Sequence, residues 1–224
     1  MAYINPPQIP QIKICGLTDP HQASACAGLG VDAIGFIFYP KSPRFITTGK
    51  AYEIAAALPR RVKAIGVFVN AVFDQIMETV ERCGLGAVQL HGQESPELVE
   101  QLSRRNLPVI KALFIGGTPE ISAAPEYNAA AFLVECAGGA LPGGNAMKWD
   151  WESARPLGKI YPLVIAGGLS PDNIGRAVES ALPDAVDVSS GVESSPGRKD
   201  LEKVKSLIEA VKRARIERPL RKIF

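Results

Sequence analysis

Three side chains that can transfer protons stand at or near the ends of short apolar runs. Cys15 closes the run Gln11–Cys15 and is followed by a glycine, a position that favours a reactive thiolate. Glu135 closes a second run, and Asp187 lies near the end of a third. A buried cysteine is often a small apolar filler, and a carboxylate in such a place can be a structural anchor. The sequence therefore predicts acid–base chemistry, with a structural alternative at each position.

Three further polar residues follow other apolar runs. Arg44 comes a few residues after the run Ala33–Phe38, where its guanidinium is either a solvated loop charge or a bidentate clamp for a substrate carboxylate. Gln89 and His91 stand at the end of the run Ala87–Leu90. The histidine is either a structural group whose hydrogen bonds are made within the protein or a part of the site. We expect these three residues, together with Asp187, to bind substrate.

Two glycine-containing segments offer backbone N–H groups to an anion. Gly167-Gly168 precedes Ser170-Pro171, which has the pattern of a helix start, and Ser190-Gly191 adds a hydroxyl group and another glycine. Bare N–H groups in front of a helix N-terminus favour phosphate. A single glycine pair is as often only a turn. The two segments together predict a phosphorylated ligand.

These residues follow a regular series of apolar runs. Each run is nearly continuous in apolar, often β-branched residues, as strands of a parallel sheet covered on both faces are. Amphipathic helical patterns lie between the runs, and Asp19-Pro20, Ser95-Pro96 and Ser170-Pro171 each place a capping side chain before a proline. The eight runs are Gln11–Cys15, Ala33–Phe38, Val62–Val69, Ala87–Leu90, Val109–Phe114, Ala131–Glu135, Leu163–Ala166 and Ala185–Val188.

Eight strand–helix units in 224 residues predict an α/β fold, a parallel eight-stranded (β/α)8 barrel, with a doubly wound sheet as the competitor. No linker divides the chain, so we expect one domain over residues 1–224 with a basic tail at about 212–224. Active sites of such barrels lie at the carboxyl ends of the strands, and phosphate sites follow strands 7 and 8. The predicted reactive residues and glycine segments fall at these places.

The composition excludes several classes of protein. With 46% hydrophobic and 21% charged residues the chain reads as an ordinary soluble globular protein. No apolar run reaches the length of about 18 residues that a membrane span needs, and Met1–Gln11 has no apolar stretch of a secretory signal. Four cysteines without a CxxC pair and two histidines disfavour a disulfide framework or a zinc site. We expect no metal and a cytoplasmic location.

The last residues of the chain are strongly basic. Six basic residues stand against Glu217 between Lys212 and Phe224, while the whole chain has a net charge of +2. Such a tail could contact nucleic acid or anionic lipid. Because no aromatic residues are interleaved with the charges, we interpret it as a solvated end and expect neither nucleic acid nor membrane as a partner.

In their order along the chain, the motifs resemble those of phosphoribosylanthranilate isomerases, which catalyse the third step of tryptophan biosynthesis from chorismate. The resemblance extends from Lys13 to about Ile208, and it is specific because all the motifs occur together. They are Lys13-Ile14-Cys15-Gly16, Gly35-Phe36 through Ser42-Pro43-Arg44, Gly66-Val67-Phe68, Gln89-Leu90-His91-Gly92, Ala166-Gly167-Gly168-Leu169, Asp187-Val188-Ser189-Ser190-Gly191-Val192-Glu193 and Gly197-Arg198-Lys199-Asp200.

The resemblance implies an Amadori rearrangement without metal or cofactor, from N-(5-phosphoribosyl)anthranilate to 1-(2-carboxyphenylamino)-1-deoxyribulose 5-phosphate. In the family, a cysteine matching Cys15 is the general base, an arginine matching Arg44 holds the anthranilate carboxylate, and loops matching Gly167-Gly168 and Ser190-Gly191 bind phosphate. A thiolate serves as the base if its pKa falls from about 8.5 toward neutrality. The expected partner is a phosphorylated small molecule, and the chain is a monomer or a homodimer.

The sequence departs from the family pattern after the sixth run. The family usually has Leu-Leu-Asp there, with the aspartate as general acid, then Gly-Gly-Thr/Ser-Gly and a tryptophan. Here the run ends Leu133-Val134-Glu135, and the loop Pro142–Ala146 precedes Trp149. Glu135 keeps the carboxyl group with one more methylene, so the resemblance implies that it is the general acid. Gly144 in the altered loop is expected to bind phosphate.

Three other functions remain compatible with the sequence. Another phosphosugar-barrel isomerase, the histidine-pathway ribonucleotide isomerase, uses two aspartates, and Cys15 argues against it. A phosphate-binding barrel that has lost catalysis is suggested by Glu135 and by the altered loop. A flavin-binding barrel is the most distant alternative.

Overall fold

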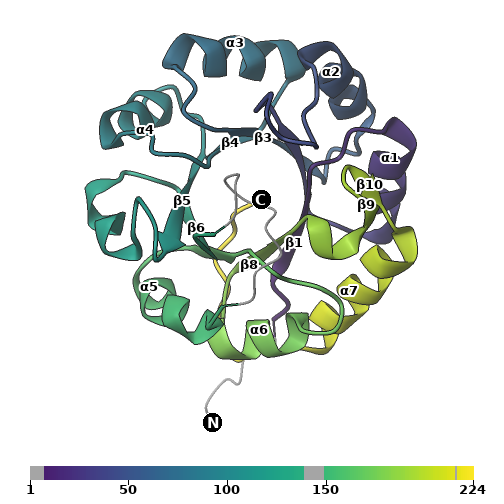
Figure 1. The fold of residues 1–224 in the computed structure, drawn as a ribbon, viewed down its shortest axis with the longest axis vertical. Coiled ribbons are helices and arrows are strands. Elements are labelled where there is room, and N and C mark those ends of the chain that lie inside the picture. The colour runs from purple at the N-terminus through teal and green to yellow at the C-terminus, as the bar shows by residue number, and fades with distance from the viewer. Residues whose placement is uncertain (1–7, 139–148, 215) are drawn as a thin grey trace.

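The computed structural model describes residues 8–138, 149–214 and 216–224. Eight parallel strands close into a barrel in sequence order, with helices around the outside (Figure 1). The (β/α)8 prediction is confirmed, and the doubly wound sheet is excluded because β1 pairs with β8. The strands are β1 (Gln11–Cys15), β2 (Ala33–Ile37), β3 (Lys63–Phe68), β4 (Ala87–Leu90), β5 (Val109–Ile115), β6 (Ala131–Cys136), β7 (Leu163–Ile165) and β8 (Ala185–Val188).

The helices follow the strands and bury their apolar faces against the barrel. Two predicted starts are confirmed, since Asp19 and Ser95 accept hydrogen bonds from the backbone N–H groups of Gln22 and Leu98. Within the described parts of the chain, no helix is long and apolar enough to cross a membrane. The α-helices are α1 (Pro20–Leu29), α2 (Thr48–Ala57), α3 (Phe73–Cys83), α4 (Pro96–Ser103), α5 (Arg155–Ile160), α6 (Ile174–Ala181) and α7 (Leu201–Arg213).

The predicted helix start at Ser170-Pro171 is wrong, because α6 begins at Ile174. The side chain of Asn173 accepts from the Ser170 N–H and donates to the Gly168 carbonyl, both at 2.8 Å. These two bonds hold the segment before the helix in a turn, and the Ile174 N–H donates to the Ser170 carbonyl at 3.0 Å.

The fifth strand–helix unit also differs from the prediction. The segment between β5 and β6 forms the 3₁₀ helix η1 (Ile121–Glu126) instead of an α-helix. Pro125 lies inside it and has no N–H to donate, which disfavours an extended α-helix. Two other short 3₁₀ helices, η2 (Trp151–Ala154) and η3 (Ser190–Val192), stand after β6 and β8.

Side chains of alternate strand residues point into the barrel, and several of them are polar. Lys13 and Cys15 are two residues apart in β1 and therefore share a face. Both are buried, and Lys13 has no exposed surface. Interior polar groups of this kind need partners within the protein, because desolvation without hydrogen bonds is costly.

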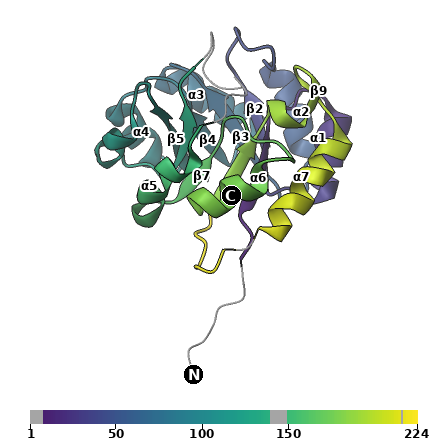
Figure 2. The same cartoon turned by 60° about the horizontal axis from the view of Figure 1, so that its bottom comes forward.

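The basic C-terminal segment is not a solvated end, contrary to the prediction. Phe224 is buried in the cluster that contains Ala33, Ala87, Ala131 and Ala185, the first residues of the even-numbered strands. Four small side chains in one layer leave room that an aromatic ring can fill. The segment thus covers the amino-terminal end of the barrel, on the opposite side from the β9 label in Figure 2.

A buried carboxylate holds this segment in place. Asp184 has no exposed surface and accepts hydrogen bonds from Arg218 and Arg221 and from the Leu163 N–H. Burial acts to raise the pKa of Asp184, but the bonds from Arg221, Arg218 and Leu163 outweigh it and hold the pKa below its ordinary value. The two arginines therefore hold the C-terminal segment against the barrel.

We expect Asp184→Asn to lower the free energy of unfolding by about 2–4 kcal/mol at neutral pH, because two partly buried arginines lose their counter-charge. A lowered carboxyl pKa contributes stability above the unfolded value of about 4, and that stability is lost as the pH falls through the folded value. The difference in urea unfolding between the wild type and the variant should therefore be full above about pH 4 and shrink as the pH falls further toward the folded pKa of Asp184. The exposed Glu209→Gln is the control, and equal stability of Asp184→Asn and wild type at neutral pH would contradict the account.

Candidate active site

One cavity at the carboxyl ends of the strands brings most of the predicted site residues together. Its lining includes both reactive candidates and the two glycines after β7, and also residues of the loops after β2 and β8. Gly144 lies outside the described residues, and Gly191 is not part of the lining. The predicted residues in the lining are Cys15, Arg44, Gln89, His91, Glu135, Gly167, Gly168, Asp187 and Ser190.

Gly191 has a packing role that explains why a glycine stands there. A Cβ atom at this position would lie only 1.8 Å from the Leu169 carbonyl oxygen. Only a residue without a side chain lets the backbone after β8 approach the backbone after β7 this closely. Gly167 and Gly168 have φ values of +79° and +65°, in the left-handed region that glycine tolerates. The glycines therefore bring the two loops together at the cavity.

Cys15 lies among charged groups at the end of β1. Lys13 forms an ion pair of 2.6 Å with Asp187, and both side chains are buried. Burial raises the pKa of the Cys15 thiol; the ammonium groups of Lys13 and Lys199 oppose this, while Asp187 adds to it. The structure does not supply the fall of this pKa toward neutrality that would favour a thiolate base, because desolvation outweighs the two cations.

Glu135 is the end of a hydrogen-bonded chain that begins at Lys13. Lys13 Nζ donates to Gln89 Oε1 at 2.9 Å, Gln89 Nε2 lies 3.0 Å from His91 Nδ1, and His91 Nε2 lies 3.0 Å from Glu135 Oε1. His91 also makes an edge contact with the ring of Phe114. The longer glutamate side chain is thus held by a specific partner and does not project freely into the cavity.

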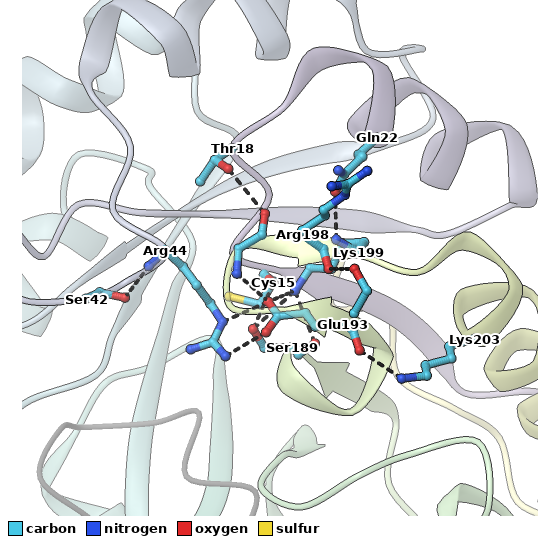
Figure 3. Close-up of polar contacts among 12 residues, drawn as sticks. Cys15, Thr18, Gln22, Ser42, Arg44, Ser189, Glu193, Arg198, Lys199 and Lys203 are labelled. Atoms are coloured by element: carbon cyan, nitrogen blue, oxygen red, sulfur yellow. Dashed lines mark hydrogen bonds and ion pairs between the residues drawn. The ribbon is translucent and has the colours of Figure 1, made fainter.

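Arg44 is bound to a carboxylate of the protein itself. Its Nε and Nη2 donate to the two carboxylate oxygens of Glu193 at 2.8 and 2.7 Å, and Lys199 donates to the same group at 2.7 Å (Figure 3). These bonds use the edge of the guanidinium that Nε and Nη2 form. The N–H groups on the outer edge, shared by Nη1 and Nη2, have the geometry to bind a second carboxylate.

The roles of Lys13, Glu193 and Lys199 were not predicted from the sequence. The last two lie on a small hairpin after β8, made of β9 (Glu193–Ser195) and β10 (Arg198–Lys199), which shows beside α1 in Figure 1. The Pro-Gly pair inside the hairpin was a usable turn signal. For Lys13 the signal was a cation inside an apolar strand, two residues before the cysteine.

One oxygen in the cavity has no partner among the described residues. Asp187 Oδ2 binds Lys13, whereas Oδ1 is buried and accepts no hydrogen bond. A buried acceptor without a donor is unfavourable by about 1–3 kcal/mol. The atom lies in a cavity-lining residue, so the hydroxyl group of a bound ligand can satisfy it.

The electrostatics of Cys15 predict the pH dependence of a reaction in which its thiolate is the base. A base must be deprotonated, so a raised pKa moves activity to higher pH, and kcat/KM should still rise above neutrality. Lys199→Met removes one of the cations that lower this pKa and should move the rise to still higher pH. The exposed Lys205→Met is the control. A rise of kcat/KM at the same or a lower pH in Lys199→Met would contradict the assignment of Cys15 as the base.

The fold and the cavity define a (β/α)8-barrel protein with a thiol and a carboxyl group facing one site at the carboxyl ends of its strands. A family model described as N-(5'phosphoribosyl)anthranilate (PRA) isomerase matches residues 12–210. The chain belongs to the N-(5'-phosphoribosyl)anthranilate isomerase family.

Individual relatives agree over almost the whole chain. The chain is 51% identical over 214 residues to an N-(5'-phosphoribosyl)anthranilate isomerase of Desulfatibacillum aliphaticivorans, covering 96% of this chain and 98% of that protein. A crystal structure of phosphoribosyl anthranilate isomerase from Thermotoga maritima superposes with a TM-score of 0.84 at 37% identity, covering 91% and 99% of the two chains.

A further structure of such an isomerase is described as a complex with reduced 1-(o-carboxyphenylamino)-1-deoxyribulose 5-phosphate. It has a TM-score of 0.82 and 36% identity to this chain, and the match covers 91% of this chain and 99% of that one. One isomerase of this family is therefore described with an aryl-amino sugar phosphate bound.

Proposed function

We propose that this chain catalyses the Amadori rearrangement of N-(5'-phosphoribosyl)anthranilate to 1-(2-carboxyphenylamino)-1-deoxyribulose 5-phosphate in tryptophan biosynthesis. The observation that carries the proposal is the placement of Cys15 on β1 and Glu135 on β6 in one cavity. The reaction needs one proton given to the ribose ring oxygen and one taken from the second ribose carbon. A carboxyl group and a thiolate in one site are suited to these two tasks.

Glu135 acts first, as the general acid. Its proton goes to the ring oxygen while the bond between that oxygen and the anomeric carbon breaks, which leaves a protonated imine between the sugar and the anthranilate nitrogen. Glu135 is buried in the cavity wall, where a carboxyl group is shielded from bulk water. The positive charge on the imine nitrogen then acidifies the proton on the neighbouring carbon.

Cys15 acts second, as the general base. Its thiolate takes the proton from the second carbon, and the electron pair of that C–H bond moves to neutralise the imine, giving an enolamine that tautomerises to the ketone. After one turnover Cys15 has gained a proton and Glu135 has lost one, so exchange with solvent restores both. The protons and electrons balance without a metal or a redox partner.

The other predicted residues hold the substrate. Backbone N–H groups around Gly167, Gly168 and Ser190 bind the phosphate, with Gly191 allowing the loops to meet. Asp187 Oδ1, which lacks a donor among the described groups, accepts a bond from a sugar hydroxyl. Gln89 and His91 border the same space. Gly144 belongs to this proposal by its position in the sequence alone.

Arg44 binds the anthranilate carboxylate with the outer edge of its guanidinium. A charge-assisted bond of this kind is worth about 1.5–3 kcal/mol, so Arg44→Ala should weaken binding of a product analogue by about 10–150-fold. Titration calorimetry with an analogue that lacks the carboxylate provides the control. An equal loss of affinity for both analogues would contradict the pairing, because it would assign Arg44 only to holding Glu193.

The proposal is tested by complementation of a tryptophan auxotroph that lacks the isomerase. Growth without tryptophan supports the activity, and failure to grow despite normal amounts of folded protein favours a phosphate-binding barrel that has lost catalysis. We expect the active protein in the cytoplasm, where cysteine thiols stay reduced. Light scattering on the purified protein decides between a monomer and a homodimer.

A further inference from the structure

We infer that Gln89 and His91 are positioning residues that fix which oxygen of Glu135 carries the acidic proton. The inference rests on the general-acid role of Glu135 proposed above and deepens it. It gives the two residues a task through Glu135 that differs from direct contact with the substrate. The starting point is the chain of hydrogen bonds from Lys13 to Glu135.

Only one arrangement of hydrogen atoms satisfies this chain. The Lys13 ammonium group can only donate, so the atom of Gln89 that faces it must be the amide oxygen. The amide NH₂ group of Gln89 then faces His91 Nδ1 and can only donate, so Nδ1 must carry a lone pair. The imidazole is therefore neutral, with its proton on Nε2.

The charge on Lys13 is itself secured by the structure. Burial acts to lower the pKa of Lys13, but the neighbouring Asp187 and Cys15 together outweigh this effect, and the pKa stays above its ordinary value. The ion pair between Lys13 and Asp187 measures 2.6 Å. The orientation of the Gln89 amide is thus set by an ammonium group that is paired with Asp187. The side chains of Lys13, Gln89, His91 and Glu135 are all buried.

The tautomer of His91 determines the state of the Glu135 carboxyl group. His91 Nε2 donates to Glu135 Oε1 at 3.0 Å, so Oε1 acts as an acceptor. A proton on that same oxygen would point at the N–H of the imidazole, and the acidic proton must therefore reside on Oε2. Both nitrogens of His91 are occupied within the protein, so the imidazole has no free N–H to offer a substrate unless the chain of bonds breaks.

Nitrogen-15 NMR of the wild-type protein tests the tautomer without any substrate. The chain has two histidines, and His21 is exposed on α1, so its signals provide an internal comparison in the same spectrum. We expect His91 to be neutral with its proton on Nε2 at neutral pH. A proton on Nδ1, or an imidazolium, would overturn the inference whatever the activity of the protein.

Gln89→Glu tests the consequence for catalysis with an isosteric change. The new carboxylate accepts from Lys13 and can only accept from His91, so Nδ1 must become protonated, and a neutral ring then turns a lone pair toward Glu135. We expect the His91 signals to change to those of the tautomer with its proton on Nδ1. We expect kcat to fall about 100-fold, because the acidic proton of Glu135 is no longer correctly directed, while KM changes less than about 3-fold. Gln93→Glu, on the exposed side of the same loop, should alter neither quantity.

The outcomes separate this inference from the proposed function. A switched tautomer with an unchanged kcat overturns the positioning role, and the isomerase activity of the wild type is unaffected by that result. Loss of activity with an unswitched tautomer also overturns it, since Gln89 would then act by some other contact. If Glu135→Gln keeps its activity, the general-acid assignment fails, and the positioning role fails with it, although the NMR result for the wild type still stands.

Discussion

Cys15→Ser folds like the wild type and loses about 10²–10⁴-fold in kcat, the range that a positioned general base contributes. A serine hydroxyl is similar in size to a thiol, so the buried end of β1 can accept it. Its pKa is far above that of a thiol, and the neighbouring Lys13 and Lys199 cannot make it ionise at a usable pH. The loss should appear in kcat more than in KM, because the phosphate and carboxylate contacts do not involve this side chain.

The matched control is another buried cysteine away from the cavity. Cys26 lies on α1 with no exposed surface, and burial raises the pKa of its thiol to about 11. Cys26→Ala should keep kcat within a few-fold of the wild type and change only stability. Near-wild-type turnover by Cys15→Ser, measured on folded protein, would remove Cys15 from the mechanism.

Glu135→Gln abolishes most of the activity at every pH, with a loss of at least about 100-fold in kcat. The amide keeps the shape of the side chain and an oxygen that can accept from His91, but it has no acidic proton for the ribose ring oxygen. Because the variant removes the acid itself, no change of pH can restore it. Steady-state kinetics across the pH range check this, with the exposed Glu179→Gln as the control.

The conservative change at the same position tests the geometry. Glu135→Asp shortens the side chain by one methylene and withdraws it from His91, and a displacement of about 1 Å can reduce a rate about 100-fold. We therefore expect it not to improve the enzyme, although aspartate is the usual residue of the family. Substantial activity of Glu135→Gln would mean that the proton comes from another group, with Asp187 the next candidate.

The fold was predictable from local patterns, because each of the eight strands shows the same short, nearly continuous apolar run. All eight strands lie within a residue or so of their expected limits. The errors arose where side chains override a local pattern. Asn173 holds a turn where Ser170-Pro171 suggested a helix, and Asp184 and Phe224 fix a tail whose charge alone suggested a solvated end.

The sequence predicts which residues belong to the site, but not which of them form hydrogen bonds with one another. Strand ends place Cys15, Glu135 and Asp187 at one face of the barrel, and alternation places them inside. The pairings could not be predicted, because they join residues far apart in the sequence, such as Arg44 with Glu193. The raised pKa of Cys15 was also hidden, because it depends on how far desolvation outweighs two cations that the fold brings close.

In the proposed mechanism the chain carries out this rearrangement with Cys15 as its base and Glu135 as its acid. The most direct measurement is the turnover of enzymatically generated N-(5'-phosphoribosyl)anthranilate by the purified protein, followed by fluorescence, for the wild type, Cys15→Ser and Glu135→Gln side by side. We expect rapid conversion by the wild type and a loss of at least about 100-fold for each variant. A folded wild-type protein that binds the reduced product analogue but converts no substrate would contradict it.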